Sequence, residues 1–139
     1  MKIKKLHTGF IMPTKGSVNA GAFDVYMPEA GSIHAFAQPF KLGFSAEVPV
    51  GHVALIFPRS STGAKFGVEL NNTCGIIDSD YRGEWVAYLR TKMGVQHAWK
   101  AGERVLQFMI VPVADVTLEL VDELDTTERG SGGFGSSGK

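Results

Sequence analysis

Apolar residues along this chain alternate with polar ones over short stretches, which is the pattern of β-strands with one buried face. Glycine, proline, asparagine and aspartate interrupt these stretches at short intervals, as turns between strands require. The pattern predicts strands at Lys2–Leu6, Phe40–Val48, His52–Phe57, Gly83–Lys92, Arg104–Pro112 and Val116–Val121. Short strands at this spacing predict an all-β sandwich or barrel.

Helix is expected only in short pieces, because no long window places apolar side chains at positions i, i+3, i+4 and i+7. The candidate is Ser60–Phe66, with Ser60 or Ser61 as the N-cap and Gly67 as the C-terminal stop. The chain should therefore be all-β, with at most one or two short helical turns.

The C-terminal part of the chain has a different composition. Residues 122–128 are acidic and polar, and residues 129–139 read RGSGGFGSSGK, with Phe134 as the one apolar side chain. Such a segment cannot form a core by itself, so we predict a β core over residues 1–121 and an extended arm over residues 122–139. The arm is either a flexible solvated tail or a backbone loop that wraps an anionic aromatic ligand.

Composition narrows the classes of partner. The 14 Lys and Arg residues balance 14 Asp and Glu residues, so the chain lacks the broad positive field that non-specific binding to nucleic acid or acidic membranes needs. Glycine takes 17 of 139 positions, against a usual share of roughly 7%, which favours many turns or a site lined by backbone. We therefore expect no nucleic-acid partner.

The location is expected to be cytoplasmic, or the host cytosol if the source is a virus. The single cysteine, Cys74, permits no intrachain disulfide and suits a reducing compartment as a buried, inert thiol. The basic N-terminal stretch has no apolar block like that of a signal peptide. The longest apolar stretch, Phe108–Ala114, is far shorter than the roughly 20 residues that span a bilayer. We expect no membrane segment.

One internal segment combines carboxylates with an aromatic and an arginine. Gly75–Gly83 reads GIIDSDYRG, and its Asp78 follows an apolar run directly. A carboxylate at the end of such a strand, partly desolvated, could take a proton from water. The simpler interpretation is an ordinary turn between two strands.

Other segments carry groups suited to an anion. Pro58–Lys65 reads PRSSTGAK and pairs two basic residues with three hydroxyls at the predicted helix start, which suits phosphate or a capped surface turn. Gln107, in an otherwise apolar strand, either faces outward or points an amide at a ligand. Asp24 is interpreted as a strand-end residue. The four histidines show no spacing or acidic partner that indicates a metal site.

Taken in order, five segments resemble the sequence motifs of the trimeric all-β deoxyuridine triphosphatases, the dUTPases. The segments are Ala20–Val25, Pro58–Val68, Gly75–Gly83, Glu103–Val113 and Arg129–Gly138. Each is a weak signal alone, whereas PRS, GIIDSDYRGE, ERVLQF and RGSGGFGS together at these separations are specific. The resemblance implies a distorted jelly-roll or β-sandwich of the dUTPase type, which forms a homotrimer with a swapped C-terminal tail.

The resemblance also implies a reaction, that of a dUTP diphosphatase: dUTP and water give dUMP and pyrophosphate. Asp78 would activate the water that attacks the α-phosphorus. Asn72 would read the uracil edge, with backbone groups around Thr73 and on the facing strand near Arg90–Met93. Tyr81 would pack against deoxyribose and exclude a 2′-hydroxyl. The reaction limits uracil incorporation into DNA and supplies dUMP for dTMP synthesis.

The remaining site residues follow from the same resemblance. Phe134 would stack over the uracil, and Asp24 and Arg59 would form a supporting charge pair. The residues implied in phosphate binding are Ser60, Ser61, Gln107, Arg129, Ser136 and Ser137. Mg²⁺ is the implied cofactor, held by the triphosphate and waters, with no metal site built from protein side chains.

Two other functions stay open on the sequence alone. One is a nucleotide-responsive binding module on the same scaffold, in which dUTP closes the tail and alters contact with an unidentified regulatory protein partner. The other is a relative of the dCTP deaminases, which share the fold but do not carry the glycine-rich fifth motif. The intact Asp78 favours the hydrolase, because a pure sensor would not require the base.

Overall fold

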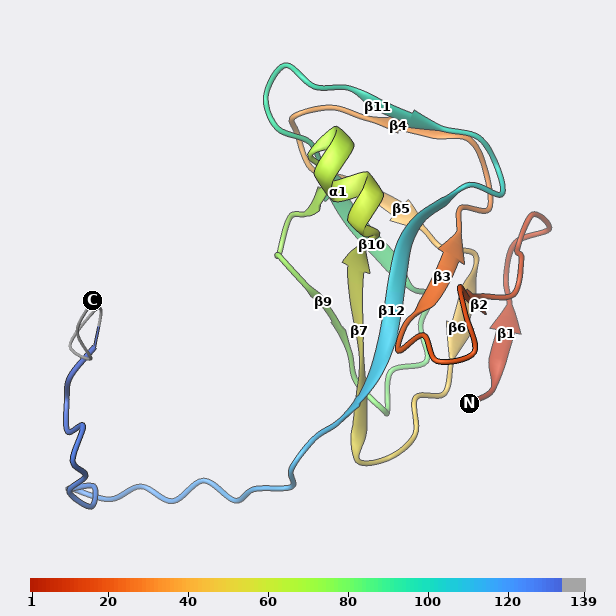
Figure 1. Cartoon of the computed structure of the whole chain (residues 1–139). Coiled ribbons are helices and arrows are strands. Elements are labelled where there is room, and N and C mark those ends of the chain that lie inside the picture. The colour runs from red at the N-terminus through yellow and green to blue at the C-terminus, as the bar shows by residue number, and fades with distance from the viewer. Residues whose placement is uncertain (134–139) are drawn as a thin grey trace.

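Strand β12 (Arg104–Pro112) is the centre of the largest sheet in the computed structural model, which describes residues 1–133 (Figure 1). It pairs antiparallel with β3 (Phe23–Tyr26) on one side and with β7 (His52–Pro58) on the other. The edges of this sheet are β2 (Thr14–Lys15) and β9 (Gly75–Ile77). The order of strands places segments that are far apart in the sequence side by side.

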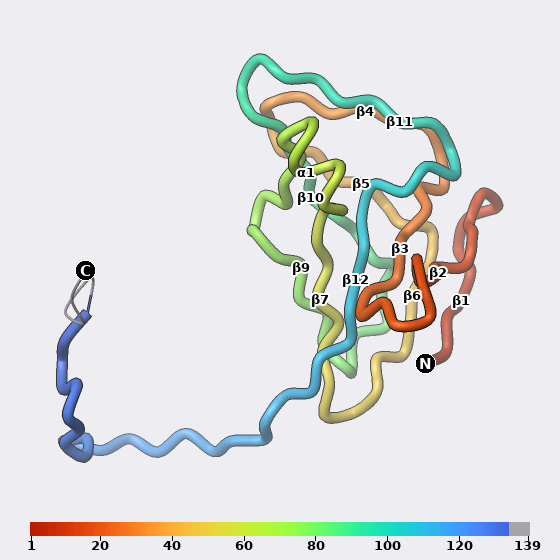
Figure 2. The backbone as a smooth tube through the Cα atoms, viewed as in Figure 1, coloured from red at the N-terminus to blue at the C-terminus, as the bar shows by residue number. Residues whose placement is uncertain are grey.

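Three smaller antiparallel sheets complete the described part of the chain. Their strands are β1 (Ile3–Lys5) with β6 (Phe44–Ala46), β5 (Gln38–Lys41) with β10 (Val86–Arg90) and β8 (Glu69–Leu70), and β4 (Gly31–Ile33) with β11 (His97–Trp99). In Figure 2 the β4–β11 pair lies near the helix, and β12 runs to the opposite end of the body.

The core joins these sheets through aromatic side chains. Trp85 is fully buried, with its ring centroid 5.0 Å from that of Phe44 and 5.2 Å from that of Phe108. The backbone N–H of Trp85 also donates to the carbonyl of Phe44 at 2.9 Å. Burial of large aromatic side chains contributes strongly to stability, so the chain just before β10 is firmly attached to the core.

Helix α1 (Ser60–Phe66) has the predicted bounds, but its N-cap differs from the prediction. The N-cap is Arg59, whose backbone is extended and whose side chain makes no cap hydrogen bond, so neither Ser60 nor Ser61 caps the helix. The C-cap is Gly67, as predicted, in the left-handed conformation with a φ of 60°. Because the serines do not cap the helix, their hydroxyls remain exposed in its first turn.

The mostly-β architecture with one short helix within residues 1–133 confirms the predicted fold class. The single strand predicted at Phe40–Val48 is wrong, because the chain turns at Gly43, whose φ of 78° ends β5 before β6 begins. The strand predicted at Val116–Val121 is also wrong, since no neighbouring strand in the described chain pairs with it. Within residues 1–133 the last strand ends at Pro112, whereas the core was predicted to extend to residue 121.

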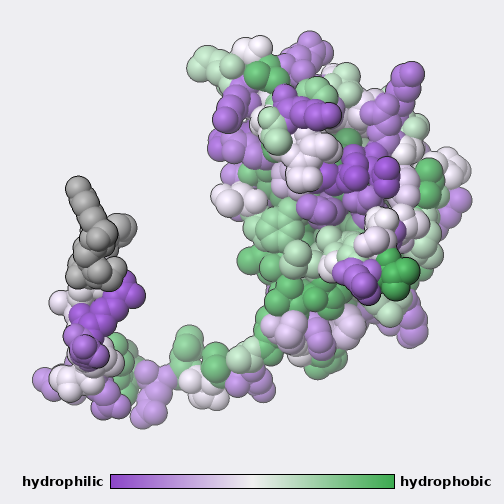
Figure 3. Space-filling view, in the orientation of Figure 1, coloured by the Kyte–Doolittle hydropathy of each residue, from purple (hydrophilic) through white to green (hydrophobic). Residues whose placement is uncertain are grey.

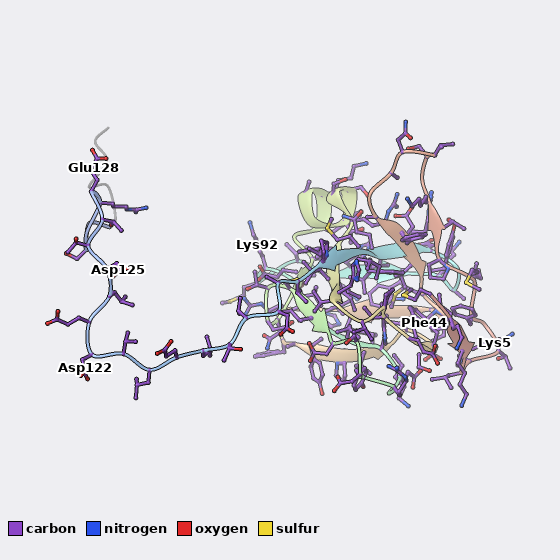
Figure 4. All side chains as sticks on the ribbon, turned by 90° about the horizontal axis from the view of Figure 1, so that it is seen from below. Lys5, Phe44, Lys92, Asp122, Asp125 and Glu128 are labelled. Carbon is purple, nitrogen blue, oxygen red and sulfur yellow. The ribbon has the colours of Figure 1, made fainter. Side chains whose placement is uncertain are left out.

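Residues 113–133 leave the body as an extended arm, along which the acidic side chains of Asp122, Asp125 and Glu128 lie (Figures 1 and 4). Figure 3 shows apolar side chains on the same arm, nearer the body. Val116, Leu118 and Leu120 are 72%, 93% and 100% exposed. Within residues 1–133 no helix is long and apolar enough to cross a membrane.

Gly31→Ala should destabilise the fold by about 1–3 kcal/mol, as overpacking of a filled core site does. Gly31 faces Trp99 across the β4–β11 pair, and a Cβ built on it would lie 2.6 Å from Cζ2 of the buried indole. Urea unfolding of both forms at one protein concentration measures the difference. Gly16→Ala is the control, because nothing lies within 4 Å of its Cβ position. An equal effect of the two substitutions would contradict the packing argument.

Candidate active site

The buried carboxylate of Asp24 in β3 holds two arginines together. Its Oδ1 accepts a hydrogen bond from Nε of Arg59 at 2.8 Å, and its Oδ2 accepts one from Nη1 of Arg104 at 3.0 Å. Asp24 itself is 7% exposed. Because one carboxylate meets two guanidinium groups, the three side chains together carry net positive charge and suit an anion.

Strand register brings further polar groups to the same place. Gln107 of β12 pairs with Asp24 of β3, and its Nε2 donates to the carbonyl of Pro58 at 3.2 Å. Pro58 is the last residue of β7, directly before the N-cap of α1. We call the resulting group the basic cluster; it consists of Asp24, Arg59, Ser60, Ser61, Arg104 and Gln107. Three segments that are distant in the sequence therefore contribute to one anion-suited surface.

Asn72 and Thr73 lie in a tight turn between β8 and β9. Thr73 has a φ of 69°, in the left-handed region that β-branched residues rarely adopt. The N–H of Thr73 donates to the carbonyl of Leu70 at 2.9 Å, and the N–H of Cys74 donates to that of Asn72 at 2.7 Å. A strained turn held by its own backbone hydrogen bonds presents the Asn72 side chain at a defined place.

Strand β10 lies opposite this turn. The N–H of Asn71 donates to the carbonyl of Tyr88 at 2.8 Å. A cavity of about 240 Å³ is formed by residues of the turn, of β10 and of neighbouring strands. Its lining residues are Ile56, Leu70, Asn71, Asn72, Gly75, Val86 and Tyr88. The structure places Val86 and Tyr88 opposite Asn72, and not Arg90–Met93 as the resemblance implied, because Arg90 pairs with Glu69 before the turn begins.

Asp78 follows β9 directly, and its carboxylate is exposed. A second cavity of about 160 Å³ is lined by Ile76, Ile77, Asp78, Tyr81 and Val86. Val86 lines both cavities, so the space beside Asn72 adjoins the space beside Asp78 and Tyr81. The Tyr81 ring lies over Gly83, where a Cβ would collide with it, and the Tyr81 hydroxyl donates to the carbonyl of Glu84 at 3.1 Å.

The single cysteine lies between these groups and stays protonated. Burial raises the pKa of the Cys74 thiol and outweighs the opposite effect of a backbone hydrogen bond with Ile56. Its Sγ lies 3.6 Å from the carbonyl oxygen of Gly75. A protonated, partly buried thiol is a weak nucleophile, so Cys74 acts as a structural residue of the turn.

Helix α1 lies at one end of β7 (Figure 1), and the strand register places the basic cluster at that end and Asp78 toward the other. Pro58 marks the end beside α1, whereas Ile77, the residue before Asp78, pairs with Ala54. The strand from Ala54 to Pro58 spans roughly 13 Å at 3.3 Å per residue. One chain therefore does not bring Asp78 alongside the serines of the basic cluster.

The arm stands apart from the basic cluster as well. Nε of Arg129 donates to the carbonyl of Gly132 at 2.9 Å, within a turn of the arm, and the arm extends away from the body (Figure 4). The other residues implied in the fifth motif, Phe134, Ser136 and Ser137, lie outside the described residues.

Sequence reasoning missed Arg104. Its carboxylate partner lies 80 positions away in the sequence, so no local pattern could indicate the pair. The one available signal was its place in Glu103–Val113, the segment that resembles the fourth motif.

Asp24→Asn should destabilise the protein by about 2 kcal/mol, because it leaves two guanidinium groups without their shared charge. Chemical denaturation of both forms measures the difference. Glu69→Gln is the matched control. It removes the carboxylate of the Glu69–Arg90 pair, whose side chains are 48% and 43% exposed, and exposed pairs contribute about 1 kcal/mol or less. If the two substitutions cost the same, Asp24 does not organise the cluster.

Comparison with known proteins links these segments to one family. The family model described as dUTPase matches residues 8–138. The deoxyuridine 5'-triphosphate nucleotidohydrolase of Syntrophotalea carbinolica is 35% identical over 143 residues, covering 99% of this chain and 96% of that protein. The protein of the same name from Nautilia profundicola is 38% identical over 140 residues, covering 100% of this chain and 99% of that protein.

Solved structures of phage dUTPases have the same fold. A mutant dUTPase of Staphylococcus bacteriophage 80alpha with dUpNHpp superposes with a TM-score of 0.90 at 22% identity, over 99% of this chain and 98% of that one. A mutant dUTPase of phage phi11 of S. aureus, described with a structural Mg(II) ion, has a TM-score of 0.79 at 17% identity, over 88% and 96%. The sequence match over nearly the whole chain and the shared fold have one explanation: this chain belongs to the dUTPase family.

Proposed function

We propose that this chain is a dUTP diphosphatase, which hydrolyses dUTP to dUMP and pyrophosphate. The observation that carries the proposal is the pair of adjoining cavities, one beside Asn72 and one beside Asp78 and Tyr81, joined at Val86. An amide that can read a base and a carboxylate that can accept a proton thus line two cavities that share Val86. The relatives that match the whole chain carry the name of this activity.

The chemistry assigned to Asp78 is general-base catalysis. Its exposed position at the end of β9 leaves room for water. The water oxygen attacks the α-phosphorus while its proton passes to the Asp78 carboxylate, and the bond from the α-phosphorus to the bridging oxygen breaks, which releases pyrophosphate. General-base assistance of this kind contributes about 10²- to 10⁴-fold in rate.

Selectivity for deoxyuridine would come from the turn and from Tyr81. The Asn72 amide can donate to O4 of uracil and accept from N3–H, a pattern that cytosine cannot match. Backbone groups at Thr73 and on β10 would complete the base contacts, with Phe134 stacked over the ring. Tyr81, held over Gly83, would pack against deoxyribose and leave no room for a 2′-hydroxyl.

The basic cluster would bind the triphosphate. The hydroxyls of Ser60 and Ser61 and the amide of Gln107 would contact the α- and β-phosphates, supported by the Asp24–Arg59 pair. The γ-phosphate would be bound by the arm. The arm residues assigned to it are Arg129, Ser136 and Ser137. Charge neutralisation and fixed geometry at the α-phosphorus are the main catalytic effects expected.

Mg²⁺ would enter with the nucleotide, bound to triphosphate oxygens and waters, where it supplies charge neutralisation. Within residues 1–133 no group of three or more His, Cys, Asp or Glu side chains could hold a metal ion. Both carboxylate oxygens of Asp24 already accept hydrogen bonds from arginines. A hydrated ion carried by the triphosphate fits this donor set better than an ion held by protein side chains.

The active unit would be a homotrimer with threefold symmetry, in which each site takes residues from more than one chain. Two observations support this. Asp78 and the basic cluster of one chain are separated along β7. The alternating apolar residues Val116, Leu118 and Leu120 face solvent in the single chain, and an unpaired strand-like segment of this kind finds its partner on another copy.

The biological role proposed for this reaction is to limit uracil incorporation into DNA and to supply dUMP for dTMP synthesis. A location in the cytosol, or in the host cytosol if the source is a virus, stays a prediction. A regulatory protein partner that senses the nucleotide-bound state also stays a hypothesis, since no described contact supports it.

Pyrophosphate release with dUTP, dCTP, dTTP and UTP tests the activity, and dUTP should be the preferred substrate by a wide margin. Asp78→Asn should lower kcat by about 10²-fold or more, because the amide cannot accept the water proton, with little change in binding of dUpNHpp. Equal rates on UTP and dUTP would contradict the role of Tyr81. An undiminished Asp78→Asn rate would contradict the general base, and ammonia release from dCTP would indicate a deaminase.

Two truncations separate the roles of the arm. Removal of residues 129–139 should abolish most turnover and leave the oligomer intact, because the phosphate-binding motif is lost while the apolar part of the arm remains. Removal of residues 114–139 should also dissociate the oligomer. Light scattering measures the mass and pyrophosphate release measures the rate. Unchanged turnover in the shorter truncation would show that the arm has no role in catalysis.

A further inference from the structure

The segment from Asp78 to Glu84 has no regular secondary structure and joins β9 to β10. Its far end is held by the buried Trp85. Between these points, the N–H of Tyr81 donates to the carbonyl of Asp78 at 3.2 Å, which is at the long limit for such a bond. Backbone contacts alone therefore hold the segment weakly, although it carries the proposed general base and the sugar-binding tyrosine.

Two side chains of the segment add to these contacts: the Tyr81 hydroxyl donates to the carbonyl of Glu84 at 3.1 Å, and Arg82 binds two further carbonyls. Its Nη1 donates to the carbonyl of Ser79 at 2.7 Å and to the carbonyl of Tyr81 at 3.1 Å. A guanidinium donor makes stronger hydrogen bonds than a neutral group. The side chain thus bends back over its own segment and ties together the peptide units that follow Ser79 and Tyr81.

The surroundings of Arg82 place it away from the two cavities assigned to base and sugar. It lines a different cavity of about 480 Å³, formed with β1, β6 and Glu47. The pKa of the Glu47 carboxyl is lowered, mainly by its hydrogen bond and ion pair with Lys2 and to a smaller extent by the charge of Arg82. Arg82 is therefore not among the residues that line the two cavities assigned to the proposed substrate.

No ion pair joins Arg82 to Asp78 or Asp80 among the described residues. Its hydrogen bonds go to backbone carbonyls instead. An arginine that only balanced the neighbouring carboxylates would not need this geometry. The contacts indicate that the guanidinium fixes the backbone conformation of the segment and does not serve to neutralise its carboxylates.

We propose that Arg82 is a positioning residue for the hydrolysis assigned above, on which this inference rests. Its guanidinium holds the Ser79 and Tyr81 carbonyls so that the Asp78 carboxylate faces the attacking water and the Tyr81 ring stays at the sugar. Arg82 itself does not touch the substrate.

Arg82→Ala should lower kcat for dUTP about tenfold, since hydrogen bonds from a charged donor are strong and their loss frees the segment. The preference for dUTP over UTP should fall as well, because Tyr81 loses its support. Arg82→Met should behave like Arg82→Ala, since it keeps the apolar stem without the donors. Arg82→Lys should restore part of kcat, because an ammonium can bond one carbonyl at a time.

Two further measurements separate positioning from a general loss of structure. Guanidinium chloride, at concentrations far below those that unfold the protein, should raise kcat of Arg82→Ala and not of the parent or of Arg82→Lys. Hydrogen exchange should speed up in residues 78–84 of Arg82→Ala and stay unchanged in β7 and β12. Lys4→Ala is the matched control, because it removes a positive charge from the same cavity and should change neither measurement.

The outcomes are distinct for each claim. An unchanged kcat in Arg82→Ala overturns the inference, and so does a loss that guanidinium does not restore and that accompanies faster exchange throughout the core. If the parent protein does not hydrolyse dUTP, the proposed function fails, and the exchange of residues 78–84 still decides whether Arg82 holds the segment.

Discussion

The antiparallel pairing of β7 with β12 on one side and β9 on the other decides where the functional groups lie. Through β12 it brings Gln107 and the Asp24 ion pairs to the end of β7 that carries α1. Through β9 it directs Asp78 toward the other end. Because hydrogen-bond register fixes every neighbour along a strand, a shift of one residue in either pairing would separate groups that now lie together.

Local chemistry explains why some elements could be predicted from the sequence. The helix Ser60–Phe66 was predicted correctly because Gly67 provides a left-handed C-cap, and the strand Arg104–Pro112 because its residues 105–111 are apolar except for Gln107. The strand predicted at Phe40–Val48 failed because its alternation continues through Gly43, where the backbone turns. The alternation of apolar and polar residues indicates which side chains are buried. It does not indicate where the backbone changes direction within a stretch of buried residues.

In the candidate site, too, some residues could be predicted from local sequence and others could not. Asn72, Asp78 and Tyr81 lie close together in the sequence, so a motif could indicate them, and the structure places them beside adjoining cavities. The partnership of Asp24 with Arg104 joins residues from separate strands, and the hydrogen bonds of Arg82 depend on the path of its own side chain. Neither contact follows from a periodic pattern, because the first joins distant strands and the second depends on the backbone path of the segment between β9 and β10.

The exposed apolar arm and the separation of Asp78 from the basic cluster would both be resolved by contact with a second copy of the chain. Burial of apolar surface stabilises by about 25 cal/mol per Å², so the exposed leucines and valine of the arm favour any surface that covers them. Among the described residues of one chain, the basic cluster has no general base beside it, and Asp78 has no phosphate-binding side chains beside it. A second copy that placed its own basic cluster next to Asp78 would complete the site. In the proposed trimer a neighbouring copy would supply both surfaces at once, so association and completion of the site would be coupled. In the proposed trimer, the exposed apolar arm would be the part of the chain that drives assembly, and the separation along β7 would be the reason that assembly matters for catalysis.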